Sequence, residues 1–311
     1  MEKQAKILIT GASGLVGSTL QEVLSAQGYT NVLGLGSKQC DLTDWQATKA
    51  FFMDAKPDYV FHMAACVYGI MGNMQNKGRS FFENTLINTH TVEASHLCGV
   101  KKIVAMGSSC AYPYPSPGEP LKEDMIWWGV PHPSEDSYGH SKRAMFAQLQ
   151  AYKENYNIPY AFVISGNLYG AGDKFDPEFG HVTPALVRKF YEAKRDGGAV
   201  SVWGNGSAER DFMYAKDAGR ALVCIMQHLE GAVNLGSGHI HAIRDIVEIL
   251  ADEAGMQGRV EWDASKPNGQ AHRSYNLDVL RGAGFTPEYT LDRGVRETYR
   301  WYAAHAETAR K

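Results

Sequence analysis

The segment ILITGASGLVGSTL at residues 7–20 constrains the fold of this chain more than any other feature of its sequence. Apolar residues come first, then Gly11, Gly14 and Gly17 in a G-x-x-G-x-x-G spacing, and then a run with helical character. Glycines in a tight turn between a strand and a helix let a pyrophosphate approach the N–H groups at the helix start. The segment therefore predicts a dinucleotide-binding β–α unit at the beginning of the fold.

Apolar runs and amphipathic runs alternate over the first two-thirds of the chain. The apolar runs predict strands at residues 31–36, 59–65, 102–109 and 160–170. The amphipathic runs predict helices at residues 15–28, 45–55, 81–99 and 141–156. Uninterrupted apolar strands separated by helices are typical of a parallel sheet covered on both faces. We therefore expect an α/β fold with a Rossmann-type doubly wound parallel sheet.

The alternation changes after Gly170, where loops and short strands take its place. We expect residues 1–165 to form the dinucleotide-binding domain, to which a later segment at about 213–242 returns. Residues 166–212 and 243–311 are expected to form a smaller, interleaved α/β substrate-binding domain. Within it, the sequence VSVWGNGSAERDFMY at 200–214 predicts a β-hairpin with a Gly-Asn-Gly-Ser turn.

Composition and charge argue against several other classes of protein. The 311 residues carry a formal net charge of −3 with no block of Lys and Arg, so we expect no nucleic acid partner. No apolar run approaches the ~18 residues of a membrane span, and the first residues lead straight into a strand. The five cysteines are scattered without a C-x-x-C pair, which indicates free thiols in a reducing cytoplasm and no metal site.

Tyr138 and Lys142 stand four residues apart at the start of a predicted helix, which places them on one face. A nearby ammonium is expected to stabilise a phenolate and to lower the pKa of the tyrosine below its reference value of ~10. Such a tyrosine can give a proton to a carbonyl oxygen as hydride reaches the carbon. Ser108 and Ser109, at the end of a predicted strand, are candidates to hydrogen-bond the same oxygen.

The end of the second predicted strand bears on the choice of cofactor. An acidic residue there binds the adenosine ribose of NAD, whereas a cationic residue accommodates the 2′-phosphate of NADP. Ser37 and Lys38 follow the strand directly, and Asp41 lies beyond them. We therefore predict NADP (NADPH) as the cofactor.

Longer motifs carry a family resemblance. The glycine triplet, HMAA at 62–65, GSSCAYP at 107–113 and the Tyr-x-x-x-Lys pair resemble the extended short-chain dehydrogenase/reductases that act on nucleotide sugars. Residues 167–190, 200–214 and 262–270 are similar to the GDP-L-fucose synthase family in particular. The resemblance implies a homodimeric enzyme that epimerises C3 and C5 of GDP-4-keto-6-deoxy-D-mannose and reduces C4, giving GDP-L-fucose.

The resemblance also implies the site residues. The catalytic residues would be Ser108, Cys110, Tyr138, Lys142 and His181. The cofactor-binding residues would be Gly11, Ser13, Gly14, Leu15, Val16, Gly17, Ser37, Lys38, Asp41, Leu42, Ala64, Ala65, Tyr138, Lys142, Ser165, Asn167, Leu168 and His181. The substrate-binding residues would be Ser109, Asn167, Val182, Lys189, Trp203, Arg210 and Asn268. For Trp203 two roles remain open, stacking on a purine and filling the domain interface.

Cys110 and His181 distinguish the implied reaction from a simple reduction. The hydrogens on C3 and C5 lie next to the carbonyl and are acidified through an enolate. Inversion therefore needs a base on one face of the sugar and an acid on the other. The reference pKa values of a thiol, ~8.5, and of an imidazole, ~6.5, bracket neutral pH. We expect Cys110 to remove the proton and His181 to return one.

Three positions depart from the family pattern: Tyr68, the pair Ser165 and Gly166, and Asn268. They keep open an alternative in which the substrate is another GDP-4-keto sugar, such as a heptose or colitose precursor. That sugar would be epimerised and reduced, or reduced at C4 alone. A non-catalytic dinucleotide-binding regulator is a further alternative, although such proteins usually lose the tyrosine or the lysine that this chain keeps.

Overall fold

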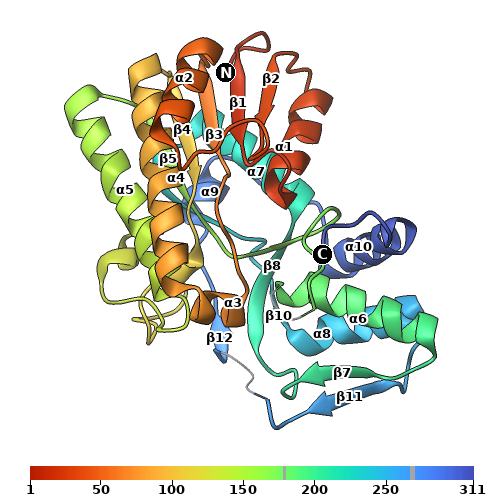
Figure 1. Cartoon of the computed structure of the whole chain (residues 1–311). Helices are drawn as coiled ribbons and strands as arrows, with labels where there is room; N and C mark the ends of the chain where they lie inside the picture. The colour runs from red at the N-terminus through yellow and green to blue at the C-terminus, as the bar shows by residue number, and fades with distance from the viewer. Residues whose placement is uncertain (178–179, 267–269) are drawn as a thin grey trace.

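The computed structural model describes residues 1–177, 180–266 and 270–311 of the chain (Figure 1). A six-stranded sheet has the order β2-β1-β3-β4-β5-β9, and every neighbouring pair is parallel. Its strands are β1 (Ile7–Thr10), β2 (Val32–Leu35), β3 (Tyr59–His62), β4 (Lys102–Met106), β5 (Tyr160–Ser165) and β9 (Gly231–Leu235). The predicted Rossmann-type fold is confirmed.

Helices cover both faces of the sheet because its central strands are apolar on both sides. One layer consists of α1 (Leu15–Ala26) and α7 (Ala215–His228), and the other of α2 (Trp45–Ala55), α4 (Lys77–Cys98) and α5 (Asp136–Tyr156). Alternate residues of β4 point toward the two helix layers. Ile103 and Ala105 pack with α4 and α5, whereas Val104 packs with α1 and α7, and all three are fully buried.

The rest of the chain forms a smaller α/β unit. In it β8 (Glu209–Tyr214) pairs with β6 (Asn167–Tyr169), β10 (Ile240–Ala242) and β12 (His272–Arg273), and β7 (Val200–Trp203) pairs with β11 (Val260–Asp263). Around a third apolar core lie α6 (Val182–Asp196), α8 (Ile243–Ala254) and α10 (Leu291–His305). The short helices are α3 (Ile70–Gln75), η1 (Ser109–Ala111), η2 (Glu123–Trp127) and α9 (Asp278–Gly282).

The chain crosses between the two units more than once. It leaves the parallel sheet after β5, builds β6 to β8, and returns through α7 and β9 before α8 begins. The domain boundaries given above stay a prediction, which this path supports. Within the described residues, no helix combines the length and the apolar character needed to cross a bilayer.

The hairpin predicted for residues 200–214 is wrong. β7 pairs in parallel with β11, and β8 joins the other small sheet. Gly204 and Gly206, with φ of +76° and +74°, turn the chain so that it does not return along β7. The Trp262 ring of β11 lies so close to Gly206 that an added Cβ would come within 2.4 Å of it. Parallel pairing of β7 with the distant β11 therefore forms in place of the local hairpin.

Lys102 joins the sheet to the α1/α7 layer through an unusual contact. Its side chain runs from β4 to the end of α7, where Nζ donates hydrogen bonds to the carbonyl oxygens of Ile225 and Met226 at 2.9 and 2.8 Å and to that of Leu229. The last carbonyls of a helix have no partner within the helix. Burial lowers the pKa of Lys102 to about 8, and the residue is 8% exposed.

We predict that Lys102→Met lowers the free energy of unfolding by about 2–3 kcal/mol, because three carbonyls at the end of α7 lose the ammonium as a donor, although that of Ile225 keeps the N–H of Leu229. Urea denaturation measures the change. Lys101→Met is the matched control: Lys101 is next in sequence, its side chain is 54% exposed, and it pairs with Asp58 at 3.0 Å. That surface pair contributes less than about 1 kcal/mol. Equal losses in the two variants would contradict the role of Lys102.

Candidate active site

Most of the predicted residues lie along one edge of the parallel sheet, where β1, β3, β4 and β5 end. Parallel strands bring their carboxyl ends to the same edge, and the strand order reverses between β1 and β3. A ligand crevice is expected at such a reversal. The loops that leave this edge carry the glycine turn, Ala64 and Ala65, Ser108 to Cys110, and Gly166.

The glycine turn leaves no room for side chains. A Cβ added to Gly11 would lie 2.7 Å from the backbone nitrogen of Ala64, and one added to Gly17 would lie 2.2 Å from the carbonyl oxygen of Gly11. Gly14 precedes α1 without any side-chain cap, so the N–H groups at the helix start are available to an anion. The turn therefore fits the close approach of a dinucleotide pyrophosphate.

The end of β2 borders this turn. A Cβ added to Gly36 would lie 3.5 Å from the hydroxyl of Ser13, and the exposed Ser37 and Lys38 follow directly. The free ammonium of Lys38 suits a 2′-phosphate. The Asp41 carboxylate accepts hydrogen bonds from the hydroxyl and the N–H of Thr43 at 2.7 and 2.9 Å, and these bonds lower its pKa.

The other predicted cofactor positions lie on the same loops or at the adjoining ends of helices and strands. Leu42 and Leu15 are buried, so they offer only their backbone to a ligand. The Ser165 hydroxyl donates to the carbonyl of Gly107 at 3.4 Å, which joins the ends of β5 and β4. The further positions at this edge are Val16, Ala65, Asn167 and Leu168.

The start of α5 packs directly on the loop that follows β4. A Cβ added to Gly139 would lie 2.5 Å from the carbonyl oxygen of Cys110. Tyr138 and Lys142 are both buried, and Lys142 Nζ lies 5.6 Å from the centre of the Tyr138 ring. Lys142 Nζ also donates to the carbonyl of Met106 at 2.8 Å. The structure therefore brings the predicted tyrosine and lysine to the strand end that carries the two serines.

The expectation that Lys142 lowers the pKa of Tyr138 is wrong for this structure. Burial raises the pKa of Tyr138 far above its reference value, and the neighbouring Cys110, Cys66 and Glu135 raise it further. Burial also lowers the pKa of Lys142 to about 7. Desolvation disfavours the charged forms of both groups. Tyr138 therefore rests as a neutral phenol, which is the form that donates a proton.

A buried polar network holds α4 and α5 against the sheet below this site. His62 is hydrogen-bonded to the Thr10 hydroxyl at 2.8 Å and to Asn88 Oδ1 of α4 at 3.0 Å. Asn88 donates in turn to the carbonyl of Ser141 in α5 at 3.4 Å. Burial, reinforced by the charge of Lys142, lowers the pKa of His62 to about 3. The ring is therefore neutral and serves as a fixed link between strands and helices.

Cys110 has charged neighbours on two sides. Ser108 Oγ accepts a hydrogen bond from its N–H at 3.2 Å. Burial, followed by the carboxylate of Glu135, raises the pKa of the thiol to about 12, whereas Arg273 opposes the rise. Arg273 lies 3.8 Å from Glu135 and donates to the carbonyl of Ser109 at 3.2 Å. The pKa of Cys110 therefore lies well above the reference value of a thiol, and Cys110 rests as a thiol.

His181 belongs to the smaller unit, where it immediately precedes α6, which starts at Val182. Its side chain is exposed and does not cap the helix. On the same loop, Asp173 is buried and interacts electrostatically with His181. Cys110 and His181 thus come from different units of the protein.

The predicted nucleotide-binding residues also belong to the smaller unit. Lys189 Nζ donates to the carbonyl of Ser201 at 3.2 Å and lies 5.7 Å from the centre of the Trp203 ring, as does Lys266. Trp203 is 46% exposed, which argues against filling the domain interface, and its stacking on a base stays a prediction. Burial and the charge of Arg273 lower the pKa of Arg210 in β8. Asn268 lies outside the described residues.

Sequence reasoning missed three charged residues that belong to this site, Glu135, Arg273 and Asp173. In the sequence each is a charged residue in a loop or a short strand, two of them beside another charge, and such residues are normally solvated. Their burial becomes visible only when distant segments pack together. Of the three, only Glu135 lies close in sequence to a predicted site residue, three positions before Tyr138.

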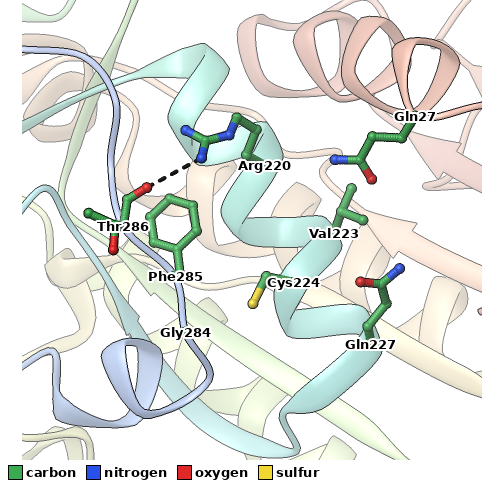
Figure 2. A pocket seen from close by; sticks show the side chains of 8 residues that line it. All are labelled: Gln27, Arg220, Val223, Cys224, Gln227, Gly284, Phe285 and Thr286. Carbon is green, nitrogen blue, oxygen red and sulfur yellow. Dashed lines mark hydrogen bonds between the residues drawn. The ribbon is translucent and has the colours of Figure 1, made fainter.

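Cavities lie at two places in the described part of the protein, one of them beside the candidate site. A cavity of about 340 Å³ lies beside the glycine turn, and residues lining it include Ser13, Ser18 and Arg310. A second, of about 200 Å³, lies between α1, α7 and the segment after α9 (Figure 2). Arg220 and Cys224 line it, but none of the predicted site residues does. In the described ranges, no group of His, Cys, Asp or Glu side chains could hold a metal ion.

A glycine turn and a tyrosine–lysine pair at the reversal point of a doubly wound sheet define a nucleotide-cofactor enzyme of the short-chain dehydrogenase/reductase type. The family model described as "NAD dependent epimerase/dehydratase family" matches residues 7–236, and the chain belongs to that family.

Within this family the chain is similar to GDP-L-fucose synthases over its whole length. It is 36% identical to "Probable GDP-L-fucose synthase 1" of Oryza sativa subsp. japonica, over 100% of this chain and 95% of that protein. It is 31% identical to the GDP-L-fucose synthase of Escherichia coli (strain K12), over 100% of both. The resemblance predicted from the motifs is confirmed.

Two solved structures show the same similarity. A GDP-L-fucose synthetase from Naegleria fowleri superposes with a TM-score of 0.93 at 30% identity, covering 100% of this chain and 97% of that one. A GDP-6-OMe-4-keto-L-xylo-heptose reductase from C. jejuni superposes with a TM-score of 0.92 at 26% identity, covering 98% of this chain and 99% of that one.

Proposed function

We propose that this protein is an NADPH-dependent epimerase/reductase that converts GDP-4-keto-6-deoxy-D-mannose to GDP-L-fucose. The observation that carries the proposal is the position of Cys110, which lies between Ser108 and the start of the helix that holds Tyr138 and Lys142. A reductase that does not epimerise has no chemical use for a thiol there. The full-length similarity to GDP-L-fucose synthases supports the same assignment.

NADPH fits the glycine turn, with Ser37 and Lys38 at its adenosine end and Ala64, Ser165 and their neighbours along the crevice. The structure of the Naegleria fowleri synthetase was also solved bound to NADP, which supports this choice. When bound, the cofactor supplies the hydride for C4. We assign the substrate diphosphate to Lys189 and Arg210, since cationic side chains suit phosphate oxygens, and the base to the exposed face of Trp203.

Tyr138 and Ser108 act on the C4 carbonyl. As hydride reaches C4, Tyr138 donates its hydroxyl proton to the carbonyl oxygen, and the Ser108 hydroxyl hydrogen-bonds the same oxygen. The resting neutral phenol is ready for this step. Lys142, held 5.6 Å from the ring centre, stabilises the phenolate that is left behind.

Cys110 and His181 act on the carbons beside the carbonyl. Cys110 removes a proton from C3 and, in a separate step, from C5. Each time, the electron pair of the broken C–H bond forms an enolate whose negative charge lies on the C4 oxygen. His181 then returns a proton to the opposite face of the same carbon. Because burial raises the pKa of Cys110 to about 12, the reactive thiolate is scarce at neutral pH. We therefore expect the rate at which Cys110 removes the protons from C3 and C5 to rise as the pH is raised above neutrality.

Exchange in heavy water tests this function directly. Without NADPH, the wild-type protein should exchange the hydrogens at C3 and C5 of the 4-keto sugar for deuterium, which NMR detects. Cys110→Ser should abolish this exchange, since a serine hydroxyl ionises far above the pH of the assay. Tyr138→Phe should keep some exchange, because Ser108 still holds the enolate oxygen, but lose NADPH-dependent reduction by about 100-fold or more.

Other results would favour a different assignment. If wild type reduces C4 but exchanges neither carbon, or if Cys110→Ser exchanges as fast as wild type, the protein is a plain 4-ketoreductase. If it turns over no keto sugar and only binds the dinucleotide, it is a regulator.

A second candidate substrate is another GDP-4-keto sugar, such as a heptose or colitose precursor. Tyr68 favours this candidate, because it departs from the family pattern and would bring bulk and a hydroxyl close to the predicted sugar pocket. The structural similarity to a heptose reductase supports it as well. Assay of a panel of GDP-4-keto sugars with NADPH separates the two candidates by their kcat/KM values.

The cofactor preference depends on Lys38 in this proposal. Lys38→Asp should weaken NADPH binding by about tenfold or more, because attraction to the 2′-phosphate becomes repulsion, and should change NADH binding far less. Fluorescence titration with each cofactor gives the two Kd values. Lys56→Asp, an equal change of charge outside the site, serves as the control. An equal loss for NADPH and NADH would contradict the assignment of Lys38.

We also propose a cytoplasmic homodimer that buries the outer face of α4 and α5. Phe81 and Phe82 of α4 and Tyr156 of α5 are 44%, 62% and 52% exposed, and the five cysteines are free thiols. Light scattering at micromolar concentration should give the mass of a dimer, and Phe82→Glu should shift it toward a monomer. Val279→Glu, at an exposed apolar position of α9, should not. A monomeric wild type would reject the dimer.

A further inference from the structure

Arg273 is a buried arginine that reaches from the smaller unit to the loop after β4. It lies in β12, where it is paired in register with Arg210 of β8, and it is 8% exposed. Its Nη1 atom donates a hydrogen bond to the carbonyl of Ser109 at 3.2 Å. That carbonyl belongs to the same planar peptide group as the N–H of Cys110. A side chain of one unit therefore fixes the peptide that precedes the thiol in the other.

Glu135 meets the same guanidinium from the start of α5. Arg273 Nη1 lies 3.8 Å from Oε1 of Glu135, and the two side chains are only 10% and 15% exposed. Glu135 directly precedes α5, and its carbonyl accepts the N–H of Gly139 at 2.9 Å. Gly139 in turn packs against the carbonyl of Cys110. The guanidinium, the carboxylate and the backbone of Cys110 thus form one cluster.

Stability alone does not account for this ion pair. Among the described carboxylates, only that of Glu135 lies within 4 Å of Arg273. The desolvation of two largely buried charges offsets most of their attraction, so such a pair contributes little net stability. Arg273 also lies beside another cation, since its charge lowers the pKa of Arg210. We therefore looked for a role of this pair in the group that it surrounds.

The two charges act on the Cys110 thiol in opposite directions. Burial raises the pKa of the thiol to about 12, Glu135 adds to the rise, and Arg273 opposes it. The other described groups that interact with the thiol are hydroxyls, those of Ser108, Tyr138 and Tyr275. Burial raises the pKa of both tyrosines, so neither carries a charge at neutral pH. Arg273 is therefore the cation of this cluster.

We propose that Arg273 is a positioning residue for Cys110: it holds the peptide before the thiol against the start of α5 and balances the carboxylate of Glu135. This rests on the proposed function, in which Cys110 acts as a base only after it has lost its proton. Because Arg273 comes from the smaller unit, the packing of β12 on the loop after β4 makes the thiol easier to ionise. Its effect passes through Cys110, without contact with the sugar or the cofactor.

Alkylation of the protein alone tests the cluster without sugar or cofactor. Iodoacetamide reacts with the thiolate, so the rate at a fixed pH, followed by mass spectrometry on the Cys110 peptide, reports how readily the thiol ionises. Arg273→Met should slow this reaction about threefold or more, because Glu135 is left without its cation. Glu135→Gln should accelerate it about threefold or more. Unchanged rates, or acceleration in both variants as from a loosened fold, would overturn the proposal.

A second arm covers the case in which Arg273→Met does not fold because it leaves Glu135 buried without a partner. In the Glu135→Gln background no carboxylate is left unpaired, and adding Arg273→Met should slow the alkylation of Cys110 relative to Glu135→Gln alone. An equal or faster rate would contradict the role of Arg273. Arg259→Met, at an exposed arginine just before β11, should leave the rate unchanged. Cys224 of α7 is the internal reference for the fold.

The heavy-water assay measures the functional consequence. Arg273→Met should slow exchange at C3 and C5 about tenfold or more and displace its pH profile to higher pH, because the thiolate forms less readily. Arg273→Lys should restore part of the rate, since it keeps the charge without the guanidinium fork. Slower exchange with an undisplaced profile would indicate a merely structural role and would overturn the proposal. The alkylation result stands even if no keto sugar exchanges, so failure of this inference and failure of the proposed function are distinguishable.

Discussion

The site depends on one buried lysine placed beneath the reversal point of the sheet. Lys142 is 1% exposed and donates to the carbonyl of Met106 at 2.8 Å, which ties α5 to the end of β4. A charged ammonium there is tolerable only if its neighbours are not also cationic. His62 meets that condition, since burial and Lys142 together lower its pKa to about 3. Its neutral ring can then join β3 to Asn88 of α4, and the helix that carries Tyr138 is fixed from below.

Burial sets the resting protonation of the groups at the candidate site. The phenol of Tyr138 and the thiol of Cys110 both stay protonated, because desolvation raises each pKa more than the nearby cations lower it. Tyr138 is thus ready to donate its proton, whereas Cys110 must first lose one before it can act as a base. His181 belongs to the other unit, where its exposed side chain immediately precedes α6. In the proposed function, proton transfer across the sugar therefore uses one group from each unit.

The sequence revealed the parts of this site whose geometry is local. The glycine turn, the Tyr138–Lys142 spacing and the Ser108–Cys110 loop depend on residues near one another in the chain, and the structure brings them together as predicted. The β7–β8 hairpin was mispredicted because the true partner of β7 is the remote β11. The pKa of Tyr138 was mispredicted because its desolvation depends on tertiary packing. Glu135, Arg273 and Asp173 were missed for the same reason, because a charged residue is expected to be solvated unless its tertiary surroundings are known.

A crystal structure with NADP and an unreactive GDP-keto-sugar analogue tests the central claim most directly. The claim is that the two units present different groups to the same sugar ring. The account predicts that Tyr138 Oη and Ser108 Oγ both contact the C4 oxygen, with Cys110 Sγ near one face of C3 and C5 and the His181 ring near the other. A sugar bound with Cys110 and His181 on the same face, or with either beyond reach of both carbons, would contradict it.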